Sequence, residues 1–460
     1  MEERKFPSSA VAAGLVLAAI SAPAFSAGFA LIEQSASGLG NAYAGTAALA
    51  EDASTVWWNP AGMAKLPTGK QFVFAGHAIQ ASTRFGDGAS VVGQSSNPAS
   101  SGNGGDAGKL SLIPSAYFTT DVAPRWKAGL GINVPFGLST KYAPDWIGRF
   151  QGISSEVNTL NVNPSVSWAV SDRFSLGGGI NWQRGTIDLI TGVNYTGSWQ
   201  GAVAAAGAAA APLLPLVGAN VEGQNHTKLE GDAWGYNAGM LWDVTSAVRL
   251  GAAYRSSIKY KMHGTAVFTN RPALPAAAGA LGTAFNAAVS DGNVGLDLKT
   301  PDSASASLVI TANPKLQWLA DVTWTGWAKI KAAPLVRENG TTMDTLVFNF
   351  RDTVRASFGA NYKVDEALTF KVGLALDQTP VPTAESRTVR LPDGDRTWLA
   401  FGAKYRLGPS STIDAGYAHL WVKDEPINNN QNPPAGVKGL VNGTYRAMVD
   451  ILSVQYTYQF

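Results

Sequence analysis

Residues 452–460 read Leu452-Ser453-Val454-Gln455-Tyr456-Thr457-Tyr458-Gln459-Phe460, so apolar and polar side chains alternate without a break. Successive side chains of an extended strand point to opposite faces, and this stretch therefore predicts a strand with one apolar and one polar face. Residues 316–325 and 368–377 alternate in the same way. The polar faces carry few charges, which indicates a sheltered interior rather than open water.

The same pattern recurs along most of the chain. Connections after even-numbered segments are tight, as at 121–124 and 170–172, whereas those after odd-numbered segments are long, as at 189–231 and 263–294. Short turns on one rim and long loops on the other are typical of outer-membrane barrels. We therefore predict an all-β membrane protein, a 14-stranded antiparallel transmembrane β-barrel over residues 70–460. Its alternating segments lie near 70–81, 110–121, 125–134, 157–169, 173–188, 232–244, 247–262, 295–311, 315–326, 351–363, 367–377, 395–407, 411–422 and 446–460.

The composition agrees with a membrane barrel. Lys+Arg (35) and Asp+Glu (33) make up 15% of the 460 residues, against roughly a quarter in soluble domains. Beyond the N-terminus no apolar run reaches about 18 residues, which excludes helical membrane spans. The net charge of +2 is scattered along the chain, so we expect no nucleic-acid partner. The absence of cysteine excludes disulfides, thiolate metal sites and thiol catalysis.

The N-terminus predicts export. Arg4 and Lys5 precede an apolar segment at 11–20, and small residues follow up to Ser26. A basic region, a short apolar region and a small-residue cleavage zone define a secretory signal peptide. We therefore predict a signal peptide over 1–26 and a mature protein in the outer membrane of a bacterium.

Residues 27–69 separate the predicted cleavage site from the first strand, and they do not alternate. Small residues dominate, and a helical pattern runs from Thr46 to Ala53. A barrel of about fourteen strands leaves a lumen that its own wall side chains do not close. We predict that 27–69 form a partly helical hatch inside the lumen. The alternative is a loose periplasmic leader, for which Trp57, Trp58 and Met63 are poor choices.

Two of the long loops are rich in alanine, at 201–219 and 272–289, and both also carry leucine and valine. Alanine favours helix, while the larger residues would leave an apolar surface on an exposed loop. Two interpretations stand: low-complexity filler, or a pair of apolar helices that shelter a hydrophobic ligand at the outer mouth.

Short motifs in a fixed order then identify a resemblance. The chain resembles the FadL/TodX family of outer-membrane transporters for long-chain fatty acids and aromatic hydrocarbons, over essentially the whole predicted mature chain. The motifs that carry the resemblance are Ala27-Gly28-Phe29, the run from Ser37 to Gly45, Asn59-Pro60-Ala61, Phe136-Gly137-Leu138, the run from Trp234 to Gly239, Tyr254-Arg255-Ser256, Pro380-Val381-Pro382 and the run from Pro392 to Arg396.

The resemblance implies a barrel plugged by an N-terminal hatch, with apolar pockets that run from the outer loops to the hatch. It assigns Phe29 and the turn Asn59, Pro60 and Ala61 to the hatch. It also implies a lateral opening beside a kink in the third strand, where Pro135, Phe136 and Gly137 match. Proline removes a ladder donor and glycine weakens a strand, so the chemistry also favours a break there. The alternative is that the strand simply ends and runs into its loop.

The fatty-acid branch of the family places basic residues where Thr191 and Pro334 stand in this chain. A carboxylate buried without a partner is costly or becomes protonated. Possible substitutes as ligand-headgroup residues are Lys329, Lys331 and Arg337. Fatty acids and neutral hydrocarbons both remain open as substrates, and the missing charges favour the neutral ones.

The residues predict no enzyme. The four histidines lie far apart, no Gly-x-Ser-x-Gly motif occurs, and nothing suggests a metal or a cofactor. We predict passive uptake of hydrophobic compounds by a monomer, with a hydrophobic small molecule and outer-membrane lipid as partners: capture in apolar loops, hatch rearrangement and lateral release. Alternatives are a general diffusion porin for small polar solutes, an adhesive surface protein and a lipase barrel.

Overall fold

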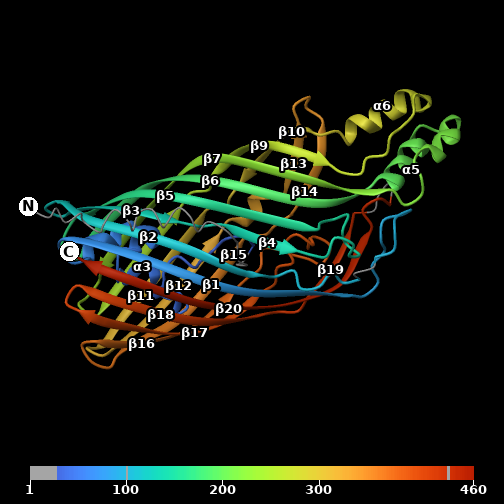
Figure 1. The fold of residues 1–460 in the computed structure, drawn as a ribbon. Coiled ribbons are helices and arrows are strands. Elements are labelled where there is room, and N and C mark those ends of the chain that lie inside the picture. The colour runs from blue at the N-terminus through green and yellow to red at the C-terminus, as the bar shows by residue number, and fades with distance from the viewer. Residues whose placement is uncertain (1–27, 100–101, 432–435) are drawn as a thin grey trace, which may run out of the picture.

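A computed structural model describes residues 28–99, 102–431 and 436–460. The predicted signal peptide, 1–26, lies outside these residues, and so does Ala27. The strands form one closed antiparallel ring, with the helices of two loops projecting beyond one end (Figure 1). No helix in the described ranges is both long and apolar enough to cross a membrane.

The wall has fourteen strands, and several of them are interrupted. The first and last wall strands pair from Gln71–Gln459 to Asp87–Gly443 and close the ring. The predicted 14-stranded barrel is therefore confirmed. In order, the wall strands are β1 (Lys70–Asp87), β2 (Leu110–Ala123), β3 (Trp126–Asn133) with β4 (Gly137–Lys141), β5 (Ser154–Ala169), β6 (Phe174–Asn194), β7 (Glu222–Asp243), β8 (Val248–Arg255) with β9 (Lys259–Phe268), β10 (Gly292–Lys299) with β11 (Ser303–Asn313), β12 (Leu316–Thr325) with β13 (Ala332–Arg337), β14 (Thr342–Val347) with β15 (Thr353–Lys363), β16 (Leu368–Asp377), β17 (Arg396–Gly408), β18 (Ser411–Val422) with β19 (Glu425–Asn430), and β20 (Leu440–Gln459).

The wall is apolar outside and polar inside. In β20, Leu452 and Val454 are more than half exposed on the outer surface, whereas Ser453 and Gln455 are buried in the lumen. This is the reverse of a soluble protein and is the arrangement of a barrel surrounded by lipid. The alternation of residues 452–460 thus predicted both the strand and its orientation.

Strands β6 and β7 run further than the alternation predicts. They pair from Phe174–Trp242 to Asn194–Glu222, whereas the sequence predicted a loop over 189–231. Beyond the Trp182–Trp234 pair, outward positions carry charges such as Arg184 and Glu230, which form an ion pair. The apolar signal stops at the edge of the membrane, while backbone pairing continues above it.

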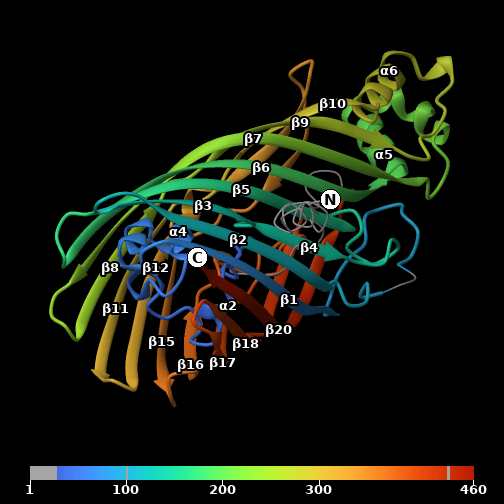
Figure 2. The same ribbon diagram turned by 60° about the vertical axis from the view of Figure 1, so that its left-hand side comes forward.

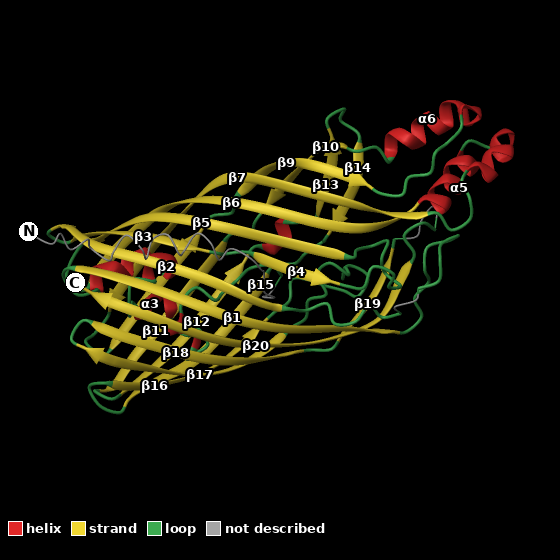
Figure 3. Ribbon diagram, in the orientation of Figure 1, coloured by secondary structure: helices red, strands yellow, loops and turns green. Residues whose placement is uncertain are grey.

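The alanine-rich loops are helical, as their composition predicts. One contains α5 (Tyr195–Ala205) and η2 (Ala208–Leu216), and the other contains η3 (Ala276–Ala278) and α6 (Gly279–Ala288). Figure 3 shows α5 and α6 side by side beyond the rim. Trp199 and Phe285 join them, with ring centroids 5.4 Å apart. A further short helix, η4 (Trp327–Lys329), follows β12.

Residues 28–69 lie inside the ring and are called the hatch below. The hatch contains α2 (Ala36–Leu39), α3 (Thr46–Leu49), α4 (Thr55–Trp58) and η1 (Pro60–Lys65). It lies at the end of the barrel opposite α5 and α6 (Figure 2). The helix predicted over Thr46 to Ala53 is shorter, because Ala50 adopts a left-handed conformation with φ 49° that ends α3.

Candidate functional site

The Asn59-Pro60-Ala61 turn fixes the hatch to the wall. The side-chain amide of Asn59 donates to the carbonyl oxygens of Ala47 (2.6 Å) and Met240 (2.9 Å), and its oxygen accepts from the Ala61 N–H (3.1 Å). Pro60 occupies the first turn of η1, where a missing N–H is tolerated. The turn therefore connects two parts of the hatch and strand β7.

A second anchor is ionic. Lys371 and Lys404 on the inner wall both contact the Glu51 carboxylate, at 2.8 and 3.0 Å, and Lys371 also lies 3.1 Å from Asp414. Burial alone would raise the pKa of Glu51, but the two lysines hold it at about 2. Glu51 is therefore a carboxylate at any physiological pH, and the middle of the hatch is tied to β16 and β17.

The first eight described residues, 28–35, are called the N-terminal strap. The strap pairs with the interrupted third wall strand: the Leu31 N–H donates to the Pro135 carbonyl and the Gly137 N–H donates to the Phe29 carbonyl, each at 2.8 Å. Ala30 and Phe136 form the bridge between these two bonds. The strap thus pairs with the residues that separate β3 from β4.

The wall is unpaired beside this bridge. Strand β2 pairs with β3 only from Ala123–Trp126 to Ala116–Ile132, and β4 pairs with β5 alone. Contact resumes where the Lys141 N–H donates to the Ala107 carbonyl. Between these points, the described strands show no sheet pairing between 108–115 and 133–140, and we call this stretch the wall window. Pro135 lacks the donor that would continue the sheet.

Side chains close the wall window in this structure. Phe136, Leu138 and Ser139 are all less than 10% exposed. On the window's rim, the Lys109 ammonium lies 2.7 Å from the Glu156 carboxylate, so that the side chain just before β2 reaches β5. The window is a break in backbone pairing rather than an open hole.

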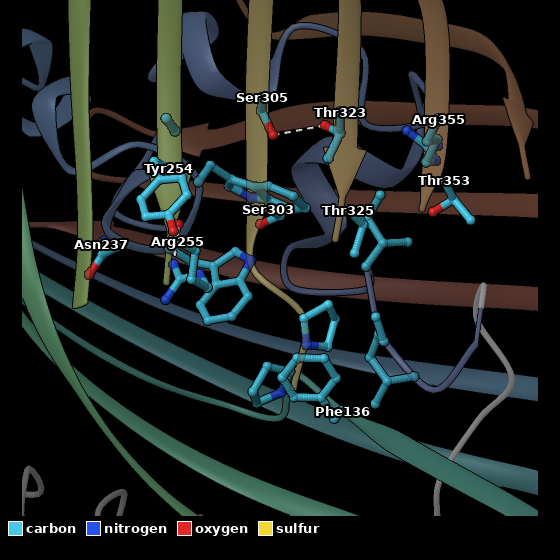
Figure 4. A pocket seen from close by; sticks show the side chains of 18 of the residues that line it. Phe136, Asn237, Tyr254, Arg255, Ser303, Ser305, Thr323, Thr325, Thr353 and Arg355 are labelled. Atoms are coloured by element: carbon cyan, nitrogen blue, oxygen red, sulfur yellow. Dashed lines mark hydrogen bonds between the residues drawn. The ribbon is translucent and has the colours of Figure 1, made fainter. Parts of the chain in front are cut away.

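A partly open cavity lies inside the barrel beside the window; its empty space, counting the part that is open to solvent, is about 1040 Å³. In Figure 4, Arg255 and Asn237 lie on one side of it, Thr325 and Thr353 on the other, and Phe136 beneath. The lining combines an apolar part and a hydroxyl part with the charged side chains of Arg255, Arg355 and Asp377. The apolar part comes from Ala30, Leu31, Ile32, Trp57, Trp58, Pro60, Pro135, Phe136 and Trp327, and the hydroxyl part from Ser303, Ser305, Thr323, Thr325 and Thr353.

Aromatic rings separate this cavity from a smaller pocket of about 260 Å³ nearer the outer loops. The Phe29 ring packs on Phe136 at 5.7 Å and on Trp327 at 4.8 Å between centroids. Tyr260 and Met262 line the smaller pocket and belong to the apolar cluster that includes the loop helices. Apolar surface therefore runs from the outer loops, past Phe29 and Phe136, to the larger cavity.

None of the three basic residues predicted for a ligand headgroup lines the larger cavity. Lys329 lies 2.5 Å from the Asp302 carboxylate, Lys331 donates to the Phe350 carbonyl, and Arg337 donates to backbone carbonyls of the loop at 288–290. The cavity's arginines are Arg255 and Arg355, which the sequence analysis did not select.

Thr191, at the position where the fatty-acid branch has a base, accepts a hydrogen bond from Arg390 of a distant loop. Burial lowers the pKa of Arg390 to about 10, so it stays charged. Only the family motif Tyr254-Arg255-Ser256 pointed to any of these arginines, and a motif does not show which way a side chain points.

Glu33 in the strap is fully buried, and neither carboxylate oxygen has a hydrogen-bond partner in the described part of the chain. Burial raises its pKa to about 7, although Arg396 and Arg355 oppose the shift.

Metal binding has no support there or elsewhere: the described residues contain no cluster of three or more His, Asp or Glu side chains able to hold an ion.

Comparisons with known proteins show which proteins this chain is similar to. Residues 17–460 match the family described as outer membrane protein transport protein (OMPP1/FadL/TodX). A 47 kDa outer membrane protein of Pasteurella multocida is 31% identical over 454 residues, covering 96% of this chain and 99% of the relative. The long-chain fatty acid transport protein of Escherichia coli (strain K12) is 28% identical over 434 residues, covering 92% of this chain and 94% of the relative.

Solved structures share the architecture. A Pseudomonas aeruginosa FadL homologue superposes with a TM-score of 0.85 at 26% identity, covering 94% of this chain and 100% of that one. The toluene transporter TodX of Pseudomonas putida gives a TM-score of 0.63 at 18% identity, covering 89% of this chain and 94% of that one, which is a likeness of fold.

Proposed function

The chain belongs to the OMPP1/FadL/TodX family of outer membrane transport proteins, and from this premise we propose that it takes up hydrophobic compounds passively and releases them sideways through its wall. Its relatives include proteins named for long-chain fatty acid transport, and its structural neighbours include a toluene transporter. The protein is a transporter of the outer membrane rather than an enzyme or a general porin.

One observation carries the proposal: the strap that lines the cavity is hydrogen-bonded to the residues that interrupt the wall. Phe29 pairs with Gly137, and Leu31 pairs with Pro135. A displacement of the strap therefore removes apolar lining from the cavity and frees the window residues in one movement. Phe29, Pro135, Phe136 and Gly137 are the residues that we assign to this step.

The rest of the hatch is proposed to stay in place. The bonds of Asn59 and the two lysines on Glu51 hold it to three wall strands, β7, β16 and β17. We propose that a ligand enters through the apolar loop helices and passes the Phe29 ring into the larger cavity. It then leaves between residues 108–115 and 133–140 into the lipid.

Burial would hold the ligand without any energy source. Apolar contact contributes roughly 25 cal/mol per Å² removed from water, which favours capture from the aqueous side, and the concentration gradient supplies the direction. We propose that a single chain performs this cycle after removal of residues 1–26, with residues 27–69 as the hatch and 70–460 as the wall.

A reversible disulfide tests the proposal, because the protein has no cysteine of its own. Ala30 and Phe136 stand opposite each other between two hydrogen bonds, and facing residues in such a pair lie about 4.5 Å apart, which suits a disulfide. With both residues replaced by cysteine, uptake of a radiolabelled oleate or toluene probe should stop under oxidation and return with a reductant.

The matched control is the Ala400→Cys, Ala418→Cys pair, which links two wall strands that are already paired. Its uptake should not depend on oxidation. Full uptake by the oxidised Ala30–Phe136 variant would overturn the proposed movement of the strap.

A further inference from the structure

The larger cavity carries an ordered polar row on its wall side. Asn237 pairs with Arg255, Arg255 with Ser303, Ser303 with Thr325, and Thr325 with Thr353. All five residues line the cavity. Neighbouring strands lie about 4.8 Å apart, so the row is a continuous strip across β7, β8, β11, β12 and β15.

This strip faces the apolar surface of the strap and the hatch. A neutral hydrocarbon that filled the cavity would take water from the hydroxyls and offer them no partner, which is unfavourable. A molecule with one polar end and one apolar tail matches both surfaces. The lining therefore favours an amphiphile.

Arg255 gives the polar strip a positive end. Its guanidinium stacks on Trp57 of the hatch, 3.4 Å from the ring centroid. It donates to the Asn181 side-chain oxygen at 2.6 Å and to the Trp57 carbonyl at 2.7 Å. Both acceptors are neutral, and among the described residues no carboxylate forms an ion pair with it.

The cavity's other cation, Arg355, likewise forms no ion pair among the described residues, but its electrostatic surroundings differ. Arg355 lies among carboxylates, because Glu33 and Asp377 both interact with it electrostatically. It also donates to the Ala42 carbonyl in the hatch at 2.8 Å. The positive charge of Arg355 is therefore balanced by carboxylates of the protein. The charge of Arg255 has no counter-ion, and an apolar ligand would also displace water from the cavity around it.

We propose that Arg255, together with the adjacent hydroxyl of Ser303, forms a carboxylate-binding site that makes the transporter selective for acid-headed amphiphiles over neutral hydrocarbons. The ligand's carboxylate neutralises the guanidinium and accepts from the serine hydroxyl. Its tail lies against Leu31, Trp58 and Phe136, towards the wall window. The inference rests on the proposed function, since it assigns the substrate class of the same cavity.

The test compares two probes that differ only at the head. Oleate and oleyl alcohol are titrated against the full-length purified protein in detergent, with tryptophan fluorescence as the readout. The unmodified protein should bind oleate at least about tenfold more tightly, because a charge-assisted hydrogen bond is worth roughly 1.5–3 kcal/mol. Arg255→Met should weaken oleate binding by about 10- to 100-fold and change oleyl alcohol binding by less than about threefold.

Arg249→Met is the matched control. Arg249 lies on the same strand and also donates to a hatch carbonyl, that of Leu49 at 3.3 Å, but it has its own carboxylate in Asp243 and does not line the cavity. This variant should leave the oleate-to-alcohol ratio unchanged. Arg255→Lys keeps the charge and should retain part of the preference.

Equal weakening of both probes by Arg255→Met would overturn the inference, since it would mean that Arg255 only supports Trp57. Equal affinity of the unmodified protein for both probes would overturn it as well. Should Arg255→Met fail to assemble, Arg255→Lys and Ser303→Val give the same comparison. Binding of neither probe by the unmodified protein would instead refute the proposed function.

Discussion

Lys109, the residue before β2, and Glu156 on β5 form an ion pair of 2.7 Å on the rim of the wall window. Strand β4 pairs with β5 at Ser139–Glu156, so the lysine reaches past β4 to its partner. Both side chains are about one-third exposed, and exposed pairs contribute at most about 1 kcal/mol. The pair is thus a weak link between the two strands, as the proposed repeated opening of the window requires.

A cross-linker of defined length tests this link. Lys109→Cys with Glu156→Cys, joined by a short rigid bis-maleimide, should abolish oleate uptake, because the start of β2 is then held to β5. A long flexible reagent should leave most uptake intact. Lys109→Met alone should change the rate by no more than about fivefold. Equal uptake with either reagent would show that the two strands need not separate.

The buried position of Gly137 between strap and wall predicts how a larger residue there affects uptake. Its N–H bonds to Phe29, and the residue is buried between strap and wall. Gly137→Val adds a branched side chain at this contact and should lower uptake several-fold, without lowering the barrel's unfolding temperature in detergent. Gly76→Val is the control, because a Cβ at Gly76 meets nothing within 4 Å. Unchanged uptake would remove Gly137 from the mechanism.

Asn59→Ala should loosen the hatch. The substitution leaves the carbonyls of Ala47 and Met240 without their donor, and a buried group that loses its partner costs about 1–3 kcal/mol. Planar-bilayer recordings should show more frequent ion-conducting openings than for the unmodified protein. Asn293→Ala, at an exposed site, is the control. Identical conductance for all three proteins would contradict the anchoring role of Asn59.

Glu33 predicts a pH dependence of strap docking. Its pKa is raised to about 7 when docked, against about 4.5 in water, so the docked form binds more protons between these values. The stability of docking is therefore full below about pH 4.5 and falls as pH rises to 7. A spin label at Ala30→Cys should become more mobile over this interval, and Glu33→Gln should abolish the change. A pH-independent signal in the parent would disprove it.

The wall could be predicted from the sequence because its signal is local. Each strand can be recognised by the alternation of apolar and polar residues, as in residues 452–460. This alternation is strong because the outer surface of a barrel faces lipid. The prediction failed where the outer surface leaves lipid: the upper parts of β6 and β7 carry Asp188 and Lys228 on their outer face. The side chains still alternate between the two faces there, but without apolar residues on the outer face the sequence resembles that of a loop.

The chemistry of the cavity could not be predicted in the same way. The kink was visible through Pro135 and Gly137, since both act on their own backbone. The pairing of Arg255 with Ser303 depends instead on register between strands far apart in sequence. Lys329 was a reasonable candidate for a headgroup until the structure placed it on Asp302. The positions of basic residues in the sequence do not show which of them lacks an acidic partner in the folded protein.

The junction of β1 with β20 imposes an order on assembly. The Phe460 N–H donates to the Lys70 carbonyl, so the seam joins the start of β1 to the residue that follows β20. The ring therefore cannot close before β20 has paired with β1. The hatch, which precedes Lys70, bonds to the inner faces of β7, β16 and β17. These inner faces are accessible while the sheet is still open. We therefore expect the hatch to dock before β20 pairs with β1, because the ring is closed afterwards.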